Sequence, residues 1–380
     1  MKILVAPDKY KGSLNSFEIS EIVKNTILEV DNSHNVFCFP MADGGDGTID
    51  IIKNYIDLEK IGLNVYDPIF REIKSEYYIS KDNKTAFIEM AKASGLELLK
   101  PEEQNCCYTS TFGTGQLIKD AILKGVSEIV LTIGGSATND AGIGIASALG
   151  YQFFDSSDNE LKPTGINLQK IDWIEDKNVI KQIKDVKFKI ACDVNNSFYG
   201  KKGSAFVYAS QKGASFPEIE ILDLGLKNIA KIIKKTKNID LQKLKYTGAA
   251  GGLGGGAIAF LNAQLVSGTN MLIGISKIKE HLDNTDLIIT GEGKIDNQTK
   301  YGKVINGISQ LAKKNKIPCI AICGSVELSL DEMKDLDIAF ISSIVNKPCN
   351  LKEAYNTTKE NLRKNIYGIF KLLKGCAEIT

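Results

Sequence analysis

The sequence has few histidines and no long hydrophobic run. Its two histidines, His34 and His281, lie away from every glycine-rich loop, so we expect neither histidine catalysis nor a histidine-rich metal site. No stretch reaches the roughly 18 consecutive apolar residues of a membrane-spanning helix. Residues 1–7 are too short for the apolar part of a secretion signal, and we expect no membrane partner.

The cysteines and the charges argue against two further classes of protein. The eight cysteines lack Cys-X-X-Cys spacing and mostly lie in apolar runs, which is typical of reduced thiols in a cytoplasmic protein. The 47 lysines and arginines nearly balance the 46 aspartates and glutamates. We therefore expect no basic surface that would bind a nucleic acid.

Two common nucleotide-binding signatures are missing or incomplete. No Gly-Lys pair precedes Ser or Thr, which excludes a P-loop nucleoside triphosphatase. Residues 252–257 match the dinucleotide fingerprint, but the preceding residues 243–247 are polar and do not predict a strand. We favour a turn or a tight helix start there, and a dehydrogenase is the weaker alternative.

Strands and helices alternate at both ends of the chain. Apolar runs predict strands at 2–7, 36–39, 287–290 and 317–323, and apolar spacing predicts helices such as 16–28 and 304–314, with Ser16 able to cap the first. The middle differs, because residues 65–89 alternate short strands with turns, including a hairpin turn at 81–83.

This pattern predicts an α/β protein of two domains. A discontinuous Rossmann-like domain with a parallel sheet contains residues 1–65 and 285–380, and a mixed α/β domain, 66–284, is inserted into it. Ligands of parallel sheets bind beyond the carboxyl ends of the strands, so we expect the active site in the cleft between the domains.

Acidic, glycine-rich loops follow two of the predicted strands. Residues 41–48 contain Asp43, Gly44 and Gly45, and residues 290–296 contain Glu292 and Asp296. Glycines let backbone N–H groups approach a ligand, and carboxylates suit Mg²⁺. Phosphoryl transfer needs this combination of positioning and charge neutralisation, although helix capping is the structural alternative for residues 41–48.

Three other loops carry candidate polar groups. Residues 134–140 offer four polar side chains within five positions, more than a cap or turn requires, so they predict ligand contact. Asp193 ends an apolar strand and suits Mg²⁺ or general-base catalysis, with an Asx-turn as the alternative. The segment 113–115 is an anion-binding candidate or a structural turn. Lys11 lies beside Gly12 and Ser13 and could pair with a carboxylate or phosphate.

Taken in order, these segments resemble the glycerate kinase family, the bacterial type with two α/β domains. The landmarks cover most of the chain and lie at residues 6–13, 40–48, 113–115, 134–140, 191–194, 211–214, 248–254 and 291–299. The resemblance implies phosphorylation of D-glycerate by ATP, with Mg²⁺, to 2-phosphoglycerate or 3-phosphoglycerate. Asn195 departs from the family pattern by removing a carboxylate.

The resemblance also implies roles for individual residues. Asp43, Asp193 and Lys11 are the candidate catalytic residues, and Asp193 is the candidate metal ligand. The candidate substrate- and phosphate-binding residues are Ser13, Gly44, Gly45, Gly113, Thr114, Gly115, Ser136, Thr138, Asn139, Glu292 and Asp296. A kinase for another small hydroxy acid and a non-catalytic ligand-binding sensor are the alternatives, and a homodimer is left open.

Overall fold

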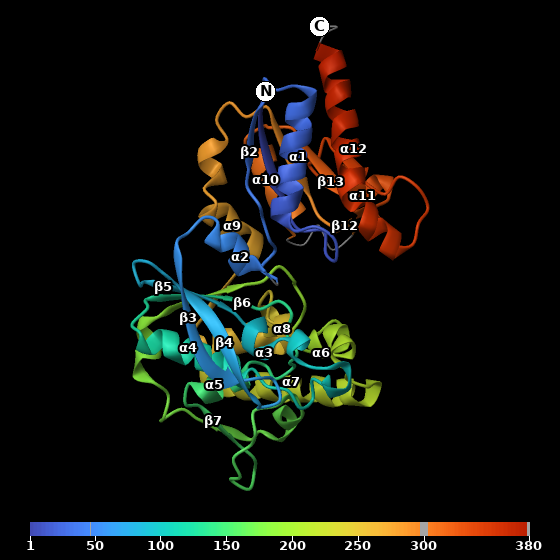
Figure 1. Cartoon of the computed structure of the whole chain (residues 1–380). Helices are drawn as coiled ribbons and strands as arrows, with labels where there is room; N and C mark the ends of the chain where they lie inside the picture. The colour runs from blue at the N-terminus through green and yellow to red at the C-terminus, as the bar shows by residue number, and fades with distance from the viewer. Residues whose placement is uncertain (46, 297–302, 378–380) are drawn as a thin grey trace. The chain divides into compact units, whose positions relative to one another are not determined.

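The computed structural model describes residues 1–45, 47–296 and 303–377 (Figure 1). Asp46 and residues 297–299, which belong to landmark segments named above, lie outside the described residues. The chain folds into two compact units. Unit 1 contains Met1–Asp43 and Thr269–Thr380, and unit 2 contains Gly44–Gly268.

These boundaries differ from those expected at 65/66 and 284/285. Strand β3 (Leu58–Tyr66) pairs along its whole length with β4 (Glu72–Ser80), so residues 44–65 belong to unit 2. At the other boundary, a Cβ on Gly307 would lie 2.5 Å from Cγ2 of Thr269, at the start of α9 (Gly268–Ile275). This close packing explains why residues 269–284 belong to unit 1.

Unit 1 is built on a five-stranded sheet in which every neighbouring pair is parallel. The strands, in spatial order, are β15 (Phe340–Ser343), β13 (Cys319–Cys323), β11 (Leu287–Gly291), β1 (Lys2–Pro7) and β2 (Asn35–Cys38). Pro7 pairs with Gly291, so the residues that follow β1 and β11 emerge side by side. A short parallel pair, β12 (Lys294–Ile295) and β14 (Ser325–Val326), lies in the loops after β11 and β13.

Helices cover both faces of this sheet. Alternate residues of a strand face opposite sides. Ile320 and Ile322 of β13 pack with apolar residues of α1 (Ser16–Val30) and α12 (Leu351–Ala377), which lie side by side in Figure 1. Ala321 and Cys323 pack instead with α10 (Val304–Lys314), and α11 (Leu330–Lys334) is a short helix after β14. Asn15, not Ser16, caps α1, because its side chain accepts the N–H of Glu18.

Unit 2 is built on a six-stranded mixed sheet, which confirms the mixed α/β character that the sequence predicts. Its strands, in spatial order, are β10 (Gln264–Val266), β9 (Lys187–Ala191), β6 (Glu128–Thr132), β5 (Thr85–Glu89), β4 and β3. Pairing is parallel from β10 to β5 and antiparallel from β5 to β3. The predicted hairpin turn joins β4 to β5, and Asn83 takes a left-handed conformation in it. A separate hairpin contains β7 (Gln152–Phe154) and β8 (Trp173–Glu175).

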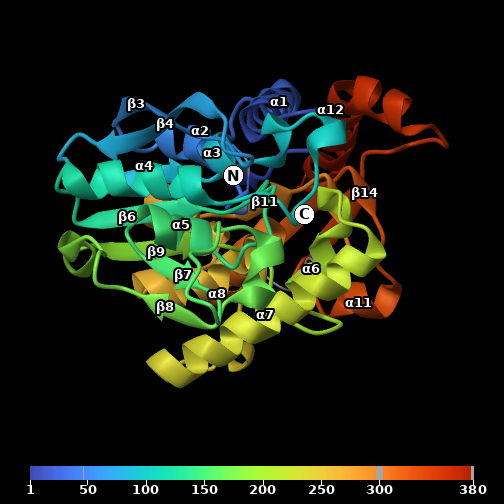
Figure 2. The ribbon, with the colours of Figure 1, turned by 90° about the horizontal axis from the view of Figure 1, so that it is seen from below.

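Seven helices among the described residues belong to unit 2 (Figure 2). They are α2 (Thr48–Lys53), α3 (Ala91–Ser94), α4 (Phe112–Leu123), α5 (Ile143–Ala148), α6 (Ser204–Tyr208), α7 (Phe216–Lys237) and α8 (Ala249–Leu261). Helix α8 is kinked by left-handed residues at Ala250, Gly251 and Gly252. The partial dinucleotide fingerprint lies within this helix, and residues 244–248 before it form a turn rather than a strand.

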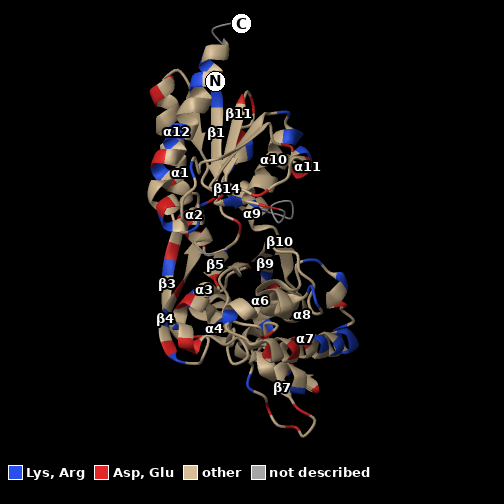
Figure 3. Cartoon of the chain, turned by 90° about the vertical axis from the view of Figure 1, so that its right-hand side faces the viewer, with Lys and Arg blue, Asp and Glu red and all other residues tan. Residues whose placement is uncertain are grey.

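The surface chemistry matches the composition. Acidic and basic residues are mixed over both units, and lysines gather at the carboxyl end of α7 (Figure 3). Within the described residues, we find no helix whose length and apolarity suit a membrane crossing. Among the described residues, we find no disulfide, and five of the eight cysteines are buried.

Candidate active site

Acidic side chains of unit 1 follow the carboxyl ends of three neighbouring parallel strands. Asp8 follows β1, Asp43 lies in the loop after β2, and Glu292 follows β11. Asp8 and Glu292 are buried, with 7% and 5% of their surface exposed. Burial raises the pKa of Asp8 well above its usual range, and the negative charges of Asp43 and Glu292 raise it further. Concentrated negative charge of this kind favours a bound cation.

Lysine ammonium groups lie beside two of the candidate acidic residues. Nζ of Lys303 is 3.8 Å from Oε1 of Glu292 and 3.6 Å from Oδ1 of Asp296. Nζ of Lys294 is 4.0 Å from Oδ2 of Asp296 and 2.7 Å from Oε2 of Glu327. The loop after β11 therefore combines carboxylates with lysines, which suits a phosphate together with a divalent cation.

The predicted residues Lys11 and Ser13 lie in a tight turn after β1. Tyr10 anchors this turn, because its buried hydroxyl donates to the Ile322 carbonyl of β13 over 2.7 Å. The Ser13 hydroxyl donates to the Tyr355 carbonyl of α12 over 3.3 Å, whereas Lys11 is exposed. The turn keeps Lys11 near the end of β1, and the substrate-binding roles of both residues stay predictions.

The glycine loop before α2 lies against the carboxyl edge of the unit 2 sheet. The backbone N–H of Gly47 donates to Oε1 of Glu89, the last residue of β5, over 2.8 Å. Gly44 has a φ of +86°, and a Cβ there would lie 3.3 Å from the Ala191 carbonyl at the end of β9. This conformation and close approach favour glycine, so the loop containing Gly44 and Gly45 is fixed between two strand ends.

Asp193 lies at the same edge of the sheet, two residues beyond β9. Its Oδ1 accepts the backbone N–H of Gly268, just beyond the neighbouring strand β10, over 3.1 Å. The side-chain oxygen of Asn195 accepts the N–H of Tyr246 over 3.2 Å. The asparagine that departs from the family pattern therefore makes a structural hydrogen bond. The catalytic or metal-binding role of Asp193 stays a prediction.

The 134–140 loop follows β6, the strand between β5 and β9. Ser136, Thr138 and Asn139 are all buried, with at most 7% of their surface exposed. Within the described residues, Oγ1 of Thr138 and Nδ2 of Asn139 have no hydrogen-bond partner. Buried polar groups nearly always have one, so these two atoms indicate a ligand or an ordered water at the loop.

Lys212 reaches this loop from the turn before α7, although the sequence-based candidates do not include it. Its Nζ donates to Oγ of Ser136 over 2.6 Å and to the Thr138 carbonyl over 2.8 Å. Burial lowers the pKa of Lys212 to about 8, while Cys106 and Asp140 act in the opposite direction. A buried lysine that faces a predicted phosphate loop is a functional candidate.

Asp140 has a structural role at the end of the same loop. Its completely buried carboxylate accepts the N–H and the hydroxyl of Thr111, both over 2.8 Å, and the N–H groups of Gly142 and Gly144 over 3.0 and 3.3 Å. These bonds join the start of α4 to the start of α5. Burial raises the pKa of Asp140, and the four hydrogen bonds oppose this effect.

The segment Gly113, Thr114 and Gly115 is used for packing in this structure. A Cβ on Gly113 would lie 1.8 Å from the Tyr66 carbonyl oxygen, and one on Gly115 would lie 2.6 Å from Cβ of Ala148. The buried Thr114 hydroxyl is 2.7 Å from the hydroxyl of Ser94. Close packing accounts for these small residues without a ligand, and their phosphate-binding role stays a prediction.

The structure thus groups the predicted residues by unit. Unit 1 brings Asp43, Glu292 and Asp296 to one edge of its sheet, and unit 2 brings the glycine loop, Asp193 and the 134–140 loop to one edge of the other. Sequence reasoning missed Asp8, Glu89 and Lys212. Asp8 and Lys212 stand inside landmark segments, but no local pattern separates them from exposed loop residues, and Glu89 ends an ordinary apolar strand.

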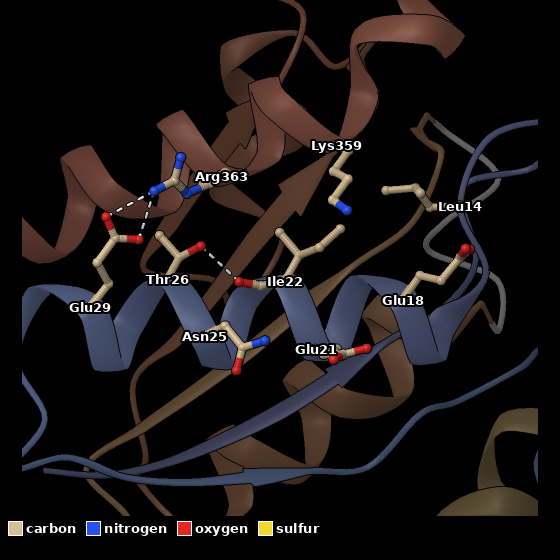
Figure 4. Close-up of a pocket in the computed structure, with 9 residues that line it drawn as sticks. All are labelled: Leu14, Glu18, Glu21, Ile22, Asn25, Thr26, Glu29, Lys359 and Arg363. Atoms are coloured by element: carbon tan, nitrogen blue, oxygen red, sulfur yellow. Dashed lines mark hydrogen bonds and ion pairs between the residues drawn. The ribbon is translucent and has the colours of Figure 1, made fainter.

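One surface cavity adjoins the candidate site residues of unit 2, and another, in unit 1, does not. A cavity of about 460 Å³ in unit 2 is lined by Gly47, Glu89 and Gly135, among others. It therefore adjoins the glycine loop before α2 and the 134–140 loop. A cavity of about 350 Å³ in unit 1 lies between α1 and α12, where Arg363 contacts both carboxylate oxygens of Glu29 at 2.8 Å (Figure 4). The second cavity contains none of the predicted site residues.

The acidic residues suit a divalent cation in their chemistry. Carboxylate oxygens are the ligands that Mg²⁺ prefers. The raised pKa of Asp8 reflects burial first and then repulsion by Asp43 and Glu292, and a cation would relieve that repulsion. Among the described residues, no three His, Cys, Asp or Glu side chains are arranged closely enough to enclose a metal ion. Mg²⁺ held by one or two carboxylates together with substrate phosphates fits both observations.

Comparisons with known proteins match nearly the whole chain to members of one family. Residues 3–374 match the model of the glycerate kinase family. A glycerate kinase of Bacillus cereus is 38% identical over 98% of both chains, and a glycerate 2-kinase of Escherichia coli is 36% identical over 95% of both. The crystal structure of a protein assigned as glycerate kinase 2 from Salmonella typhimurium LT2 superposes with a TM-score of 0.83. It is 34% identical and covers 100% of this chain and 99% of its own.

Proposed function

The chain belongs to the glycerate kinase family and is a kinase, and from this premise we propose that it phosphorylates D-glycerate with ATP and Mg²⁺. The relative from Escherichia coli is named for the 2-position, which favours 2-phosphoglycerate over 3-phosphoglycerate as the product. A cytoplasmic location and an active site in a cleft between the two domains stay proposals that follow from the sequence.

The observation that carries the proposal is the 134–140 loop. It follows a central parallel strand, and it holds the buried Oγ1 of Thr138 and Nδ2 of Asn139, for which the described residues supply no partner. Both groups can donate hydrogen bonds to anionic oxygens. We assign them, with Ser136, to the phosphates of the nucleotide or of the transferred group.

The chain's own residues supply the remaining parts of the reaction. Lys11 would bind the glycerate carboxylate or a transferring phosphoryl oxygen. Asp43 and Asp193 would supply the general base and a Mg²⁺ ligand, in an order left open. Mg²⁺ would neutralise charge on the phosphates as the phosphoryl group moves to the substrate hydroxyl, whose proton passes to the base. The acidic cluster of unit 1, formed by Asp8, Asp43 and Glu292, suits the cation side of this chemistry.

Release of ADP from Mg-ATP, with and without D-glycerate, tests the activity. Release that depends on D-glycerate supports the proposal, and phosphorus NMR of the product then identifies the phosphorylated hydroxyl. A panel of other small hydroxy acids tests the acceptor, since faster turnover of another acid would replace D-glycerate as the substrate. Binding of ATP without turnover of any acid would favour a sensor.

Two substitutions test the catalytic carboxylates. Asp43→Asn and Asp193→Asn remove one charge each and keep the size of the side chain, and we expect each to lower kcat by about 100-fold or more. Asp57→Asn is the matched control, because the Asp57 side chain is exposed and pairs with the exposed Lys81 at 2.7 Å. Wild-type turnover in both active-site variants would refute the assignment.

A further inference from the structure

Lys212 is a buried lysine whose main chain is firmly held. It ends a short 3-10 turn between α6 and α7 and has only 4% of its surface exposed. Its carbonyl accepts the N–H of Cys106 over 3.1 Å, and its N–H donates to the Ala209 carbonyl over 3.0 Å. The next residue, Gly213, has a φ of +86°, and a Cβ there would lie 1.7 Å from the Gln104 carbonyl oxygen. The start of the lysine side chain is therefore fixed.

The lysine stabilises a particular geometry of the 134–140 loop. Two of its three Nζ–H donors are used, one on Oγ of Ser136 and one on the Thr138 carbonyl. An ammonium group can only donate, so the Ser136 oxygen must be the acceptor. The Ser136 proton then points away from Lys212 and can be donated to another acceptor, such as an anionic oxygen.

Burial of this ammonium group is unfavourable on its own. Lysine is almost never fully buried unless it is paired, and the acid whose charge acts on Lys212, Asp140, already accepts four hydrogen bonds elsewhere. The lowered pKa of Lys212 reflects this burial. A phosphate anion at the adjacent loop would supply the missing negative charge.

We propose that Lys212 is a positioning residue for phosphate binding. It fixes the Ser136 hydroxyl as a donor, holds the Thr138 carbonyl in place and gives the buried loop a positive charge. The inference rests on the proposed function, because it identifies the anion at the loop as a phosphate of the nucleotide or of the transferred group.

A double-mutant cycle tests the positioning role. Lys212→Met removes the charge and the donors but keeps the length of the side chain, and we expect kcat/KM for Mg-ATP to fall about 100-fold. Ser136→Ala alone should lower it about 10-fold. Because Lys212 orients Ser136, adding Ser136→Ala to Lys212→Met should lower it by less than about 3-fold more. Lys202→Met, an exposed lysine before α6, is the matched control and should stay at the wild-type value.

The outcomes separate this inference from the proposed function. If the wild-type protein shows no glycerate-dependent ADP release, the proposed function fails. If it is active, the inference is overturned when folded Lys212→Met stays within 3-fold of wild type, or when the effects of the two substitutions multiply. If Lys212→Met does not fold, Ser136→Ala decides alone, because wild-type kcat/KM in that variant contradicts a donor role for Ser136.

Discussion

Replacing Asp140 by alanine should strongly destabilise unit 2. The substitution removes the acceptor of four hydrogen bonds and leaves buried donors on Thr111, Gly142 and Gly144. Each buried donor without a partner costs about 1–3 kcal/mol, and removal of a carboxylate that is itself unfavourably buried offsets part of that cost. We therefore expect the free energy of unfolding to fall by about 3–5 kcal/mol.

Asparagine at this position provides an internal comparison. An amide oxygen can replace Oδ2, which accepts three of the four bonds, but the amide N–H₂ would then face the N–H of Gly142. Asp140→Asn should therefore lose less, about 2 kcal/mol. This order of the two variants follows from the bonding pattern and not from the loss of charge alone.

The single tryptophan of the chain gives a direct assay for unit 2. Trp173 of β8 stacks on Phe154 at a ring distance of 4.2 Å, so its fluorescence during urea unfolding reports on this unit and not on unit 1. Asp82→Ala is the control, because exposed Asp82 accepts its hydrogen bonds in a hairpin turn where water can replace them. A loss of less than about 1 kcal/mol in Asp140→Ala would refute the reasoning.

Three further results are expected. Gly113→Ala should destabilise unit 2 by about 3 kcal/mol or more, because the new Cβ would meet a carbonyl oxygen at 1.8 Å. Gly368→Ala, in open space on α12, should instead stabilise unit 1 by up to about 1 kcal/mol. Thermal unfolding measures both variants, and an equal change in stability for the two would contradict this. The pKa of Lys212 falls from 10.5 to about 8 on folding, so between these values the unfolded chain binds more protons than the folded chain. The free energy of unfolding of unit 2 should therefore rise by about 3 kcal/mol as the pH increases through that window, and Lys212→Met should lack this rise. Urea unfolding of both proteins at pH 7.5 and pH 10 tests this, and an equal change in the two proteins would contradict it. Tyr10→Phe should destabilise unit 1 by about 1 kcal/mol by leaving a β13 carbonyl without its donor, and unchanged hydrogen exchange of β13 would count against this.

Much of the fold could be predicted because the strands carry strong local signals. The apolar runs of β1, β6 and β11 are almost completely buried, and the predicted helix at 304–314 has the same bounds in the structure. The domain boundaries could not be placed in this way. Strand β3 has mostly half-buried or exposed residues, and only its pairing with β4 assigns it to unit 2.

The candidate site was only partly predictable, because glycine has two uses that look alike in a sequence. Gly113 and Gly44 both stand in short glycine segments near acidic or hydroxyl residues. In the structure, Gly113 is required by packing against a carbonyl, whereas Gly44 combines a positive φ with a close approach to the end of β9. The distinction depends on contacts with residues more than 40 positions away, which no local pattern contains.

The same limit explains why Lys212 was missed and why it is informative. A lysine in a Gln-Lys-Gly-Ala segment has no local sign of burial, and the interactions that define it come from Ser136 and Thr138, more than 70 positions earlier. Buried charge is unfavourable unless a partner compensates for it, so such a residue needs an explanation beyond packing. Two groups that find no partner in the described part of the chain, Oγ1 of Thr138 and Nδ2 of Asn139, lie in the loop that Lys212 holds. An anion at this loop would satisfy the lysine charge and both groups together, whereas a water molecule could satisfy only the hydrogen bonds. Stabilisation of unit 2 by inorganic phosphate or ATP in the wild type, absent in Lys212→Met, would distinguish the two explanations.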